Sequence, residues 1–490
     1  MDTPRRIDDL ADELISDILS YLLGSESAAY NPRDSCHGTN GGSLTVYGEK
    51  TELDRFRLVC RRFTRIGTPR KFPLFVLRFS RDGFQRLEDL LHMQLACHVR
   101  YFTYMVRPFY QGSGWSHALT AVESENRSVA HVHYRRLHDQ KYIVDRNQDI
   151  AMLRRAIAAF PALQQVKLLR LQDEADEQLL GYLREESLEE NARLDWESAC
   201  ARAVTSLGIS LLDSKCTSVR FVAPQLSPEA TVQLLQTPPT MLSALGARLT
   251  SLDVTFHAHS DMTTSMEMLS HVFYEFFLAA KNLTAIHLGF PANLPLDLSL
   301  DRIFHRLQWK RLRTLSIQGW RLGSDEIISL IRRHRRPLRD VRLASVYLRA
   351  GGRWCDVLSV LHDEMDLLER IDLREINYTA DFDADHYHNY APVNSNGHGH
   401  GHGDGNFDGP LLSVVAQPSP DLPPPQTADY LSFAPRGNTR RSFTDATLEK
   451  LRLLTADDLG DNGVRVHRKQ QLFWEAWVLS GLRNNIRQRD

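Results

Sequence analysis

The sequence has no run of apolar residues approaching the ~18–20 that a helix needs to cross a membrane, so we expect no membrane association. Its six cysteines stand apart, without a CxxC pair or a regular spacing, which excludes a dense disulfide framework. Reduced thiols are therefore predicted, in a cytoplasmic or nuclear protein. The formal net charge of -2 over 490 residues gives no overall attraction to nucleic acid.

Catalytic signatures are also missing. No GxSxG elbow, Walker loop, HExxH motif or kinase motif set occurs, and GSGWSH at 112–117 lacks the apolar strand that an elbow needs. We therefore expect a protein that is not an enzyme and that has no cofactor, catalytic residue or metal. An enzyme with an unrecognised site is the alternative.

Apolar residues are abundant enough for a large core. They make up 42% of the chain against 24% for charged residues, which is typical of a globular protein. The length allows two to four domains or one long repeat array.

An amphipathic helix is predicted near the start of the sequence, in RIDDLADELISDILSYLLG at 6–24. Acidic residues at its beginning complement the helix dipole, and Gly24 stands where a glycine ends a helix. Residues 24–50 are rich in Gly, Ser and Asn and predict a flexible insertion. The apolar face of the helix repeats every four residues and consists of Leu10, Leu14, Ile15, Ile18, Leu19 and Leu22.

The helical pattern resumes in TELDRFRLVCRRFTRIGTPRKF at 51–72. Two short helices and a turn at Gly67–Pro69 are predicted there, with the arginines in water. Cys60 is expected to be a small, buried apolar residue. The residues expected to face inward are Leu53, Phe56, Leu58, Val59, Phe63 and Ile66.

The two segments LADELISDILSYL and ELDRFRLVCRRFTRI together resemble the F-box, a small helical module that docks on the Skp adaptor of cullin-RING ubiquitin ligases. The F-box pattern begins Leu-Pro-x-Glu, continues with Ile or Leu pairs, and later has Val-Cys-Arg/Lys-x-aromatic. Ala11 replaces the proline, and the insertion at 24–50 separates the two segments. The matching positions are Leu10, Glu13, Leu14, Ile15, Ile18, Leu22, Val59, Cys60, Arg61 and Phe63.

The resemblance implies that residues 1–72 form an F-box. It also implies that this module binds a Skp-type adaptor and, through it, a cullin. An ordinary N-terminal helical cap on the following repeats is the alternative. The resemblance assigns adaptor binding to Leu10, Leu14, Ile15, Ile18, Leu22, Leu58, Val59 and Phe63.

Residues 73–378 repeat one spacing: apolar, two residues, apolar, one residue, apolar. It occurs in VRYFTY (99–104), LQQVKL (163–168), CTSVRF (216–221), LTSLDV (249–254), LTAIHL (283–288), LRTLSI (312–317), LRDVRL (338–343) and LERIDL (368–373). From 216 onward the period is about 30 residues, and a helical stretch precedes most copies, which is the signature of a leucine-rich-repeat solenoid. Longer gaps before 163 and 216 indicate insertions.

The predicted fold class is therefore α/β: a small N-terminal helical F-box followed by an irregular leucine-rich-repeat-like α/β solenoid. This arrangement resembles fungal-type F-box/LRR substrate receptors, although the Asn or Cys of the strict repeat is missing. A plain α/β domain with a parallel sheet is the alternative, because variable spacing suits it too.

The middle residue of each repeat is predicted to point to the face of the sheet where solenoids bind. Across five neighbouring strands these residues are Asp253, His287, Ser316, Arg342 and Asp372. They form a candidate substrate-binding row. A solvated sheet face without function is the alternative.

The composition changes after the repeats. Residues 379–442 are rich in Gly, Pro, His and Asp, which predicts a disordered linker. Five histidines between 386 and 402 lack cysteine partners and helical spacing, so we expect no metal site. Residues 443–490 contain an amphipathic helix with Phe473, Trp474 and Trp477, expected to cover the open end of the solenoid; an exposed aromatic partner motif is the alternative.

The strongest basic run, LIRRHRRPLRDVR at 330–342, follows a predicted helix, whose dipole favours cations at its C-terminal end. Without a known nucleic-acid-binding pattern we expect no nucleic-acid partner. The sequence therefore predicts the substrate-recognition subunit of an SCF-type ubiquitin ligase that binds an unknown protein target. A leucine-rich-repeat scaffold acting outside a ligase is the alternative.

Overall fold

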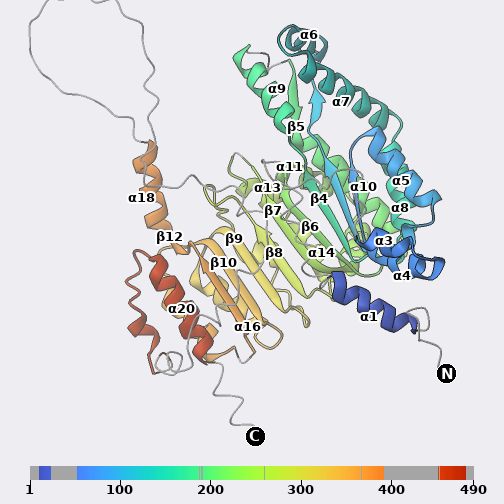
Figure 1. Ribbon diagram of the computed structural model, residues 1–490. Helices are drawn as coiled ribbons and strands as arrows, with labels where there is room; N and C mark the ends of the chain where they lie inside the picture. The colour runs from blue at the N-terminus through green and yellow to red at the C-terminus, as the bar shows by residue number, and fades with distance from the viewer. Residues whose placement is uncertain are drawn as a thin grey trace, which may run out of the picture.

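The computed structural model describes residues 10–23, 52–186, 188, 191–258, 260–365, 367–390, 451 and 453–481. The chain is an α/β protein built on one mostly parallel central sheet, which confirms the predicted class (Figure 1). The predicted insertion at 24–50 lies outside the described residues.

The central sheet places its strands side by side in chain order. Its order is β1-β2-β4-β6-β7-β8-β9-β10-β11, with β12 also pairing with β10, and every pairing is parallel. Each of the eight repeated segments contributes one strand, whereas β1 and β12 were not predicted. The strands are β1 (Leu74–Arg78), β2 (Tyr101–Val106), β4 (Gln165–Arg170), β6 (Val219–Leu226), β7 (Leu249–Phe256), β8 (Ala285–Gly289), β9 (Thr314–Leu322), β10 (Asp340–Leu348), β11 (Arg370–Arg374) and β12 (Asn377–Tyr378).

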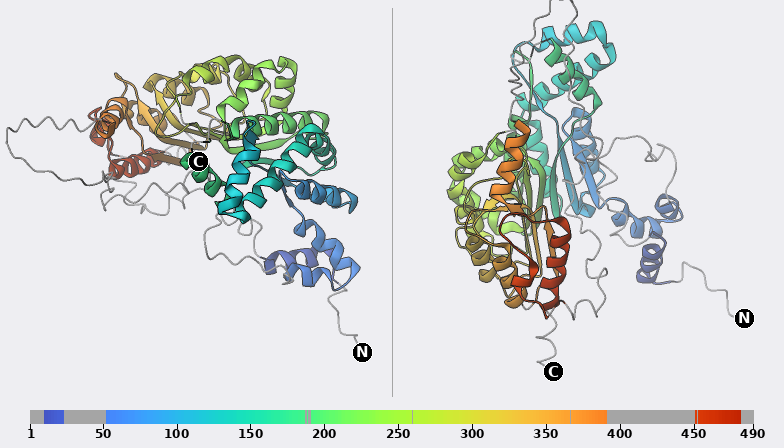
Figure 2. Two further views of the ribbon diagram at one scale, coloured as in Figure 1. Left: turned by 90° about the horizontal axis from the view of Figure 1, so that it is seen from above. Right: turned by 90° about the vertical axis from the view of Figure 1, so that its left-hand side faces the viewer.

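The helices between these strands pack along one face of the sheet (Figure 2, right). Parallel neighbours require such crossovers, because a strand must return to its starting end before the next can begin. The helices are α5 (Arg81–His92), α8 (Gln148–Ala158), α10 (Trp196–Asp213), α11 (Pro228–Val232), α12 (Pro239–Arg248), α13 (Thr263–Met268), α14 (Ser270–Ala279), α15 (Leu300–Phe304), α16 (Ser324–Arg333) and α17 (Trp354–Asp363).

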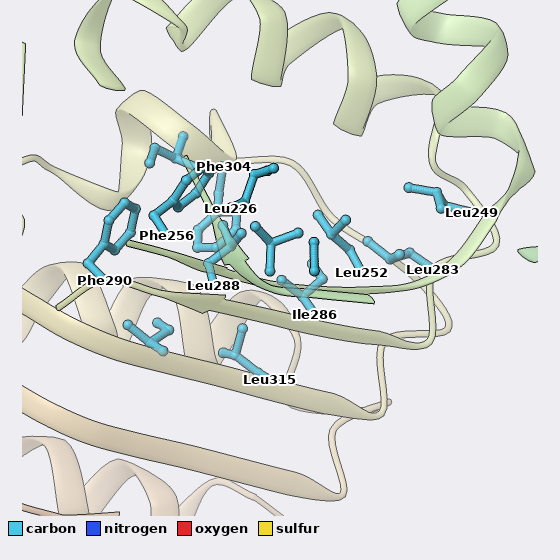
Figure 3. Packing of buried hydrophobic residues seen from close by; sticks show 14 of the residues in the cluster. Leu226, Leu249, Leu252, Phe256, Leu283, Ile286, Leu288, Phe290, Phe304 and Leu315 are labelled. Carbon is cyan, nitrogen blue, oxygen red and sulfur yellow. The ribbon is translucent and has the colours of Figure 1, made fainter. Parts of the chain in front are cut away.

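The main core lies between these helices and the sheet. Alternate residues of each strand, such as Leu252, Ile286 and Leu315, point toward it (Figure 3). Phe290 and Trp320 pack edge to face with ring centroids 5.0 Å apart, and both are fully buried. The remaining side chains of each strand therefore point to the opposite face of the sheet, away from the crossover helices, and this face is here called the strand face.

The two long segments between repeats, after β2 and after β4, form a smaller unit at the far end of these strands. Its strands β3 (Phe109–Gln111) and β5 (Arg193–Asp195) are antiparallel, and its helices are α6 (Trp115–Glu125), α7 (Arg127–Asp145) and α9 (Glu174–Glu185). A separate apolar cluster holds these elements together. The gaps therefore contain ordered structure that extends the sheet without joining it.

The C-terminal segment packs on the last strand. Helix α20 (Arg468–Ser480) follows the turn η6 (Ala456–Leu459), lies against β11, and buries Trp474 and Trp477, while Phe473 is 37% exposed. The Glu475 carboxylate accepts a hydrogen bond from the Leu373 amide at 2.6 Å. The helix thus provides a hydrogen-bond partner for a backbone amide of β11, the edge strand, which would otherwise be unpaired.

The predicted linker at 379–442 begins with ordered structure. Helix α18 (Thr379–Tyr390) covers its first twelve residues, so the prediction of disorder is wrong there. The Phe382 ring packs on Tyr347 with centroids 4.4 Å apart, and Arg321 pairs with Asp383 at 2.7 Å. These contacts hold a helix that its composition does not favour; residues 391–442 lie outside the described residues.

Glu475→Gln is expected to stabilise the protein above neutral pH. Burial raises the pKa of Glu475 to about 7 from an ordinary 4.5. The folded state therefore keeps a proton that the unfolded state releases, so wild-type stability falls as pH rises through this window. The variant keeps an oxygen acceptor for the Leu373 amide and should gain ~2–3 kcal/mol at about pH 8 and nothing near pH 4.

Thermal unfolding across this pH range measures the effect. Glu369→Gln is the matched control, because its carboxylate is 71% exposed. Identical pH profiles for Glu475→Gln and the wild type would contradict the buried position of this carboxylate.

Candidate protein-binding surfaces

The N-terminal helices form a small packed unit. They are α1 (Asp12–Leu23), α3 (Glu52–Arg57) and α4 (Arg61–Lys71), and α1 lies against α4. Ile15 and Leu19 of α1 are buried, as is Phe63 of α4. The Phe63 ring stacks on Phe56 of α3 at 4.5 Å between centroids, so one aromatic pair joins the two short helices.

Arginines of α4 bind the polar side of α1. Arg62 donates to the Asp12 carboxylate at 2.6 Å, and Arg70 donates to the Ser16 carbonyl at 2.8 Å. The hydrogen bond from Arg62 is the main reason that the pKa of Asp12 is lowered. The arginines of this basic segment therefore hold α4 against α1, a contact here called the clamp, which the sequence did not predict.

The outer side of the same unit is apolar and exposed. Leu14, Ile18 and Tyr21 follow the i, i+4, i+7 spacing of one helix face, and they are 52%, 41% and 90% exposed. Leu58 and Val59, in the link between α3 and α4, are 65% and 62% exposed. The clamp at Asp12 holds the start of α1 next to the start of α4, directly after this link. We call these five residues the docking face.

The predicted adaptor-binding residues separate into two groups in the structure. Leu14, Ile18, Leu58 and Val59 are on the docking face. Ile15 and Phe63 are buried inside the unit, and Leu10 is half-buried. The side chain of Leu22 lies outside the described residues. Tyr21 was missed, although its spacing from Leu14 and Ile18 could have identified it.

Several expectations for residues 53–69 are wrong. Leu58 and Val59 do not face inward, and Cys60 is exposed. Helix α3 ends at Arg57, so the helical periodicity used for that prediction does not continue through the link. No turn forms at Gly67–Pro69, because both residues lie within α4.

The candidate row on the strand face is a single line across the sheet. Asp253 pairs in register with His287, His287 with Ser316, Ser316 with Arg342, and Arg342 with Asp372. The order follows from the common spacing of the repeats, because the same position of each repeat pairs with that position in the next strand. None of the five residues belongs to the main core.

These polar side chains are more buried than the sequence indicates. Asp253, His287, Ser316 and Arg342 are only 4–8% exposed. A solvated face is therefore wrong for these four positions. Asp372 is less buried, and its carboxylate accepts a bidentate pair of hydrogen bonds from Arg374.

Hydrogen bonds link the row to its neighbours. The His287 ring bonds Ser316 through Nδ1 at 2.8 Å and Thr255 through Nε2 at 3.1 Å. Arg342 donates to Asp340 at 3.0 Å. Burial lowers the pKa of His287, which keeps the imidazole neutral and leaves one ring nitrogen to donate and the other to accept.

The residue types Asp253, His287 and Ser316 invite comparison with a hydrolase triad. In such a triad the two ring nitrogens bond the serine and the acid. Here the nitrogen opposite Ser316 bonds Thr255 instead, while Asp253 pairs with Arg220 at 3.3 Å.

Arginines near the row were not predicted. Arg370 and Arg374 lie two positions from Asp372 along β11. Arg220 lies on β6, two positions from Val222, which pairs with Asp253 of the neighbouring β7. The side chains of Arg220, Arg370 and Arg374 are 42%, 36% and 35% exposed. The two-residue period of a strand places them on the same face, which was the available signal. They are the more accessible polar groups of this part of the strand face.

Neither metal nor membrane features occur in the part of the chain that the structure describes. No group of three or more His, Cys, Asp and Glu side chains there is arranged to hold a metal ion, and none of its helices has the length and apolar character to span a bilayer. The histidines at 398, 400 and 402 lie outside this part. Neither the known protein-family models nor the curated proteins compared with the sequence match it.

Proposed function

We propose that this chain is the substrate-recognition subunit of an SCF-type (Skp-cullin-F-box) ubiquitin ligase. In this proposal residues 1–72 are the F-box, and its docking face binds a Skp-type adaptor that connects the chain to a cullin. The chain supplies recognition and the other subunits supply the chemistry. The exposed apolar surface formed by Leu14, Ile18, Tyr21, Leu58 and Val59 is the observation that carries the proposal.

The size of this surface supports an interface role. A fully buried Leu or Ile side chain contributes ~1.5–3 kcal/mol relative to exposure. Five large apolar side chains can therefore supply on the order of 10 kcal/mol, which is comparable with the ~4–15 kcal/mol cost of association. An exposed apolar face on α1, whose other side buries Ile15 and Leu19, is typical of an interaction site.

We also propose that residues 73–378 are an irregular leucine-rich-repeat-like solenoid that holds the protein target. The supporting observation is the strand order, because strands follow one another across the sheet and their helices share one face. A doubly wound α/β domain reverses its strand order and has helices on both faces. Arg220, Arg370 and Arg374 offer the target more accessible contacts than the buried row.

Affinity purification of the full chain from cells, with and without proteasome inhibition, tests this function. Mass spectrometry should find a Skp-type adaptor and a cullin under both conditions. Candidate targets should increase when the proteasome is blocked. Recovery of other proteins without adaptor or cullin would favour the scaffold alternative.

A further inference from the structure

Exposed cations gather in three neighbouring loops at the N-terminal ends of adjacent strands in the central sheet. The loops precede β8, β9 and β10 and include part of the basic run at 330–342. Strand pairing places them next to one another, since Ala285 pairs with Thr314 and Thr314 with Asp340. We call these cations the basic edge: Lys281, Lys310, Arg311, Arg313, Arg335 and Arg336.

The neighbouring loops are joined directly by hydrogen bonds. The Arg313 amide donates to the Thr284 carbonyl at 2.7 Å, and the Arg339 amide donates to the Arg313 carbonyl at 2.8 Å. The Arg311 guanidinium reaches Asn282 of the preceding loop at 3.2 Å. Adjacent strands lie ~4.8 Å apart, so the six cations occupy a short continuous edge.

None of these six cations has a carboxylate within ion-pairing distance among the residues that the structure describes. The nearby acids have other arginine partners. Glu364 pairs with Arg332 at 2.6 Å, and Glu369 lies 3.7 Å from Arg339. Asp301 pairs with Arg306 at 2.7 Å and lies 3.8 Å from Arg333.

The helix dipole explains only part of the basic run. Arg332 and Arg333 stand in the last turn of α16, where a cation is favoured. Arg335 and Arg336 lie beyond that turn. Lys310, Arg311 and Arg313 are separated from the end of α15 at Phe304 by a loop, and the dipole effect falls off within one turn. The helix dipole therefore does not offset the repulsion among these cations, although Glu364 also attracts Arg335.

We propose that the basic edge binds an acidic segment of a partner protein. Four of its six cations are arginines, whose planar groups match carboxylates better than lysine does. Trp309, the aromatic residue of these loops, is 2% exposed and offers no platform for stacking nucleic-acid bases. Leu283, Leu312 and Leu338 of the same loops are buried, so they offer no apolar anchor to a lipid surface. This inference does not depend on the ligase role.

Fluorescence anisotropy of the full chain with a short labelled polyglutamate peptide tests the proposal. The wild type should bind polyglutamate and not polyglutamine, and the affinity should fall as salt increases. Lys310→Glu combined with Arg311→Glu and Arg313→Glu should weaken binding at least about tenfold. Arg311→Lys combined with Arg313→Lys should weaken binding less than the charge reversal does, because the charge is kept while the planar group is lost.

The matched control is Arg86→Glu combined with Arg127→Glu and Arg193→Glu. These arginines are also exposed and lie outside the basic edge, so binding should stay within about twofold of the wild type while the charge change is the same. Circular dichroism shows that each variant is folded. Equal loss in both triple variants would overturn the proposal. So would tighter binding of single-stranded RNA, or of phosphatidylserine vesicles, than of polyglutamate.

Discussion

A chain carrying Leu14→Asp and Ile18→Asp is expected to lose binding to a Skp-type adaptor by at least about a hundredfold. Because Leu14 and Ile18 are about half-exposed, each substitution removes ~1–1.5 kcal/mol of apolar burial, and the carboxylate placed in the interface costs at least ~1–3 kcal/mol more. The total exceeds the ~3 kcal/mol that corresponds to a hundredfold change. Pull-down with purified adaptor, followed by titration, measures the loss.

The fold should survive these two substitutions, because both side chains are at least 41% exposed on the outer side of α1. Leu235→Asp combined with Leu472→Asp is the matched control: these leucines are 43% and 48% exposed and lie far from α1 in the sequence. The control should bind the adaptor as the wild type does. Unchanged binding by the Leu14 and Ile18 double variant would show that the docking face does not hold the adaptor.

Trp320→Ala is expected to destabilise the repeat region by ~3–5 kcal/mol. Trp320 is fully buried on β9, and its ring packs on Phe290 and Phe304. Its indole nitrogen donates to the Leu298 carbonyl at 2.9 Å. The variant therefore leaves both a cavity and an unsatisfied carbonyl.

Denaturant unfolding, followed by far-UV circular dichroism, measures this loss. Trp196→Ala is a suitable comparison, because that ring is only partly buried and should cost less. A cost of under about 1 kcal/mol for Trp320→Ala would contradict the packing of β9 against its helices. Adaptor binding should be retained wherever the protein is folded, since Trp320 lies outside the N-terminal unit.

The sheet could be predicted in detail because its signal is local and repeated. One apolar spacing marks eight strands, and the two-residue period of a strand then fixes which side chains share a face. The row from Asp253 to Asp372 was identified in this way, with its cross-strand order. Strand β1 carries the same spacing in FPLFVL at 72–77, but the repeats were sought only after residue 72, so this copy was missed.

Burial in the row could not be predicted from the same pattern. The period gives the face of each side chain but not its neighbours. Hydrogen bonds among His287, Ser316 and Thr255 depend on side chains from three strands. The accessible arginines, such as Arg220, were missed although the two-residue period places them on the same face.

The N-terminal unit shows a different limit. A continuous helical period was assumed through Leu58 and Val59, but α3 ends at Arg57 and the link turns both side chains outward. The arginines were expected in water, whereas Arg62 and Arg70 bind α1. The arginine contacts join segments some 50 residues apart, and a local pattern carries no information about them.

The central claim is that the docking face binds a Skp-type adaptor. Hydrogen exchange of the full chain, measured by mass spectrometry with and without purified adaptor, tests it most directly. The account predicts slower exchange in α1 from Leu14 to Tyr21 and in the link at Leu58 and Val59, with no change in the strands of the central sheet. Exchange that is unaltered throughout α1 and this link at saturating adaptor would contradict it.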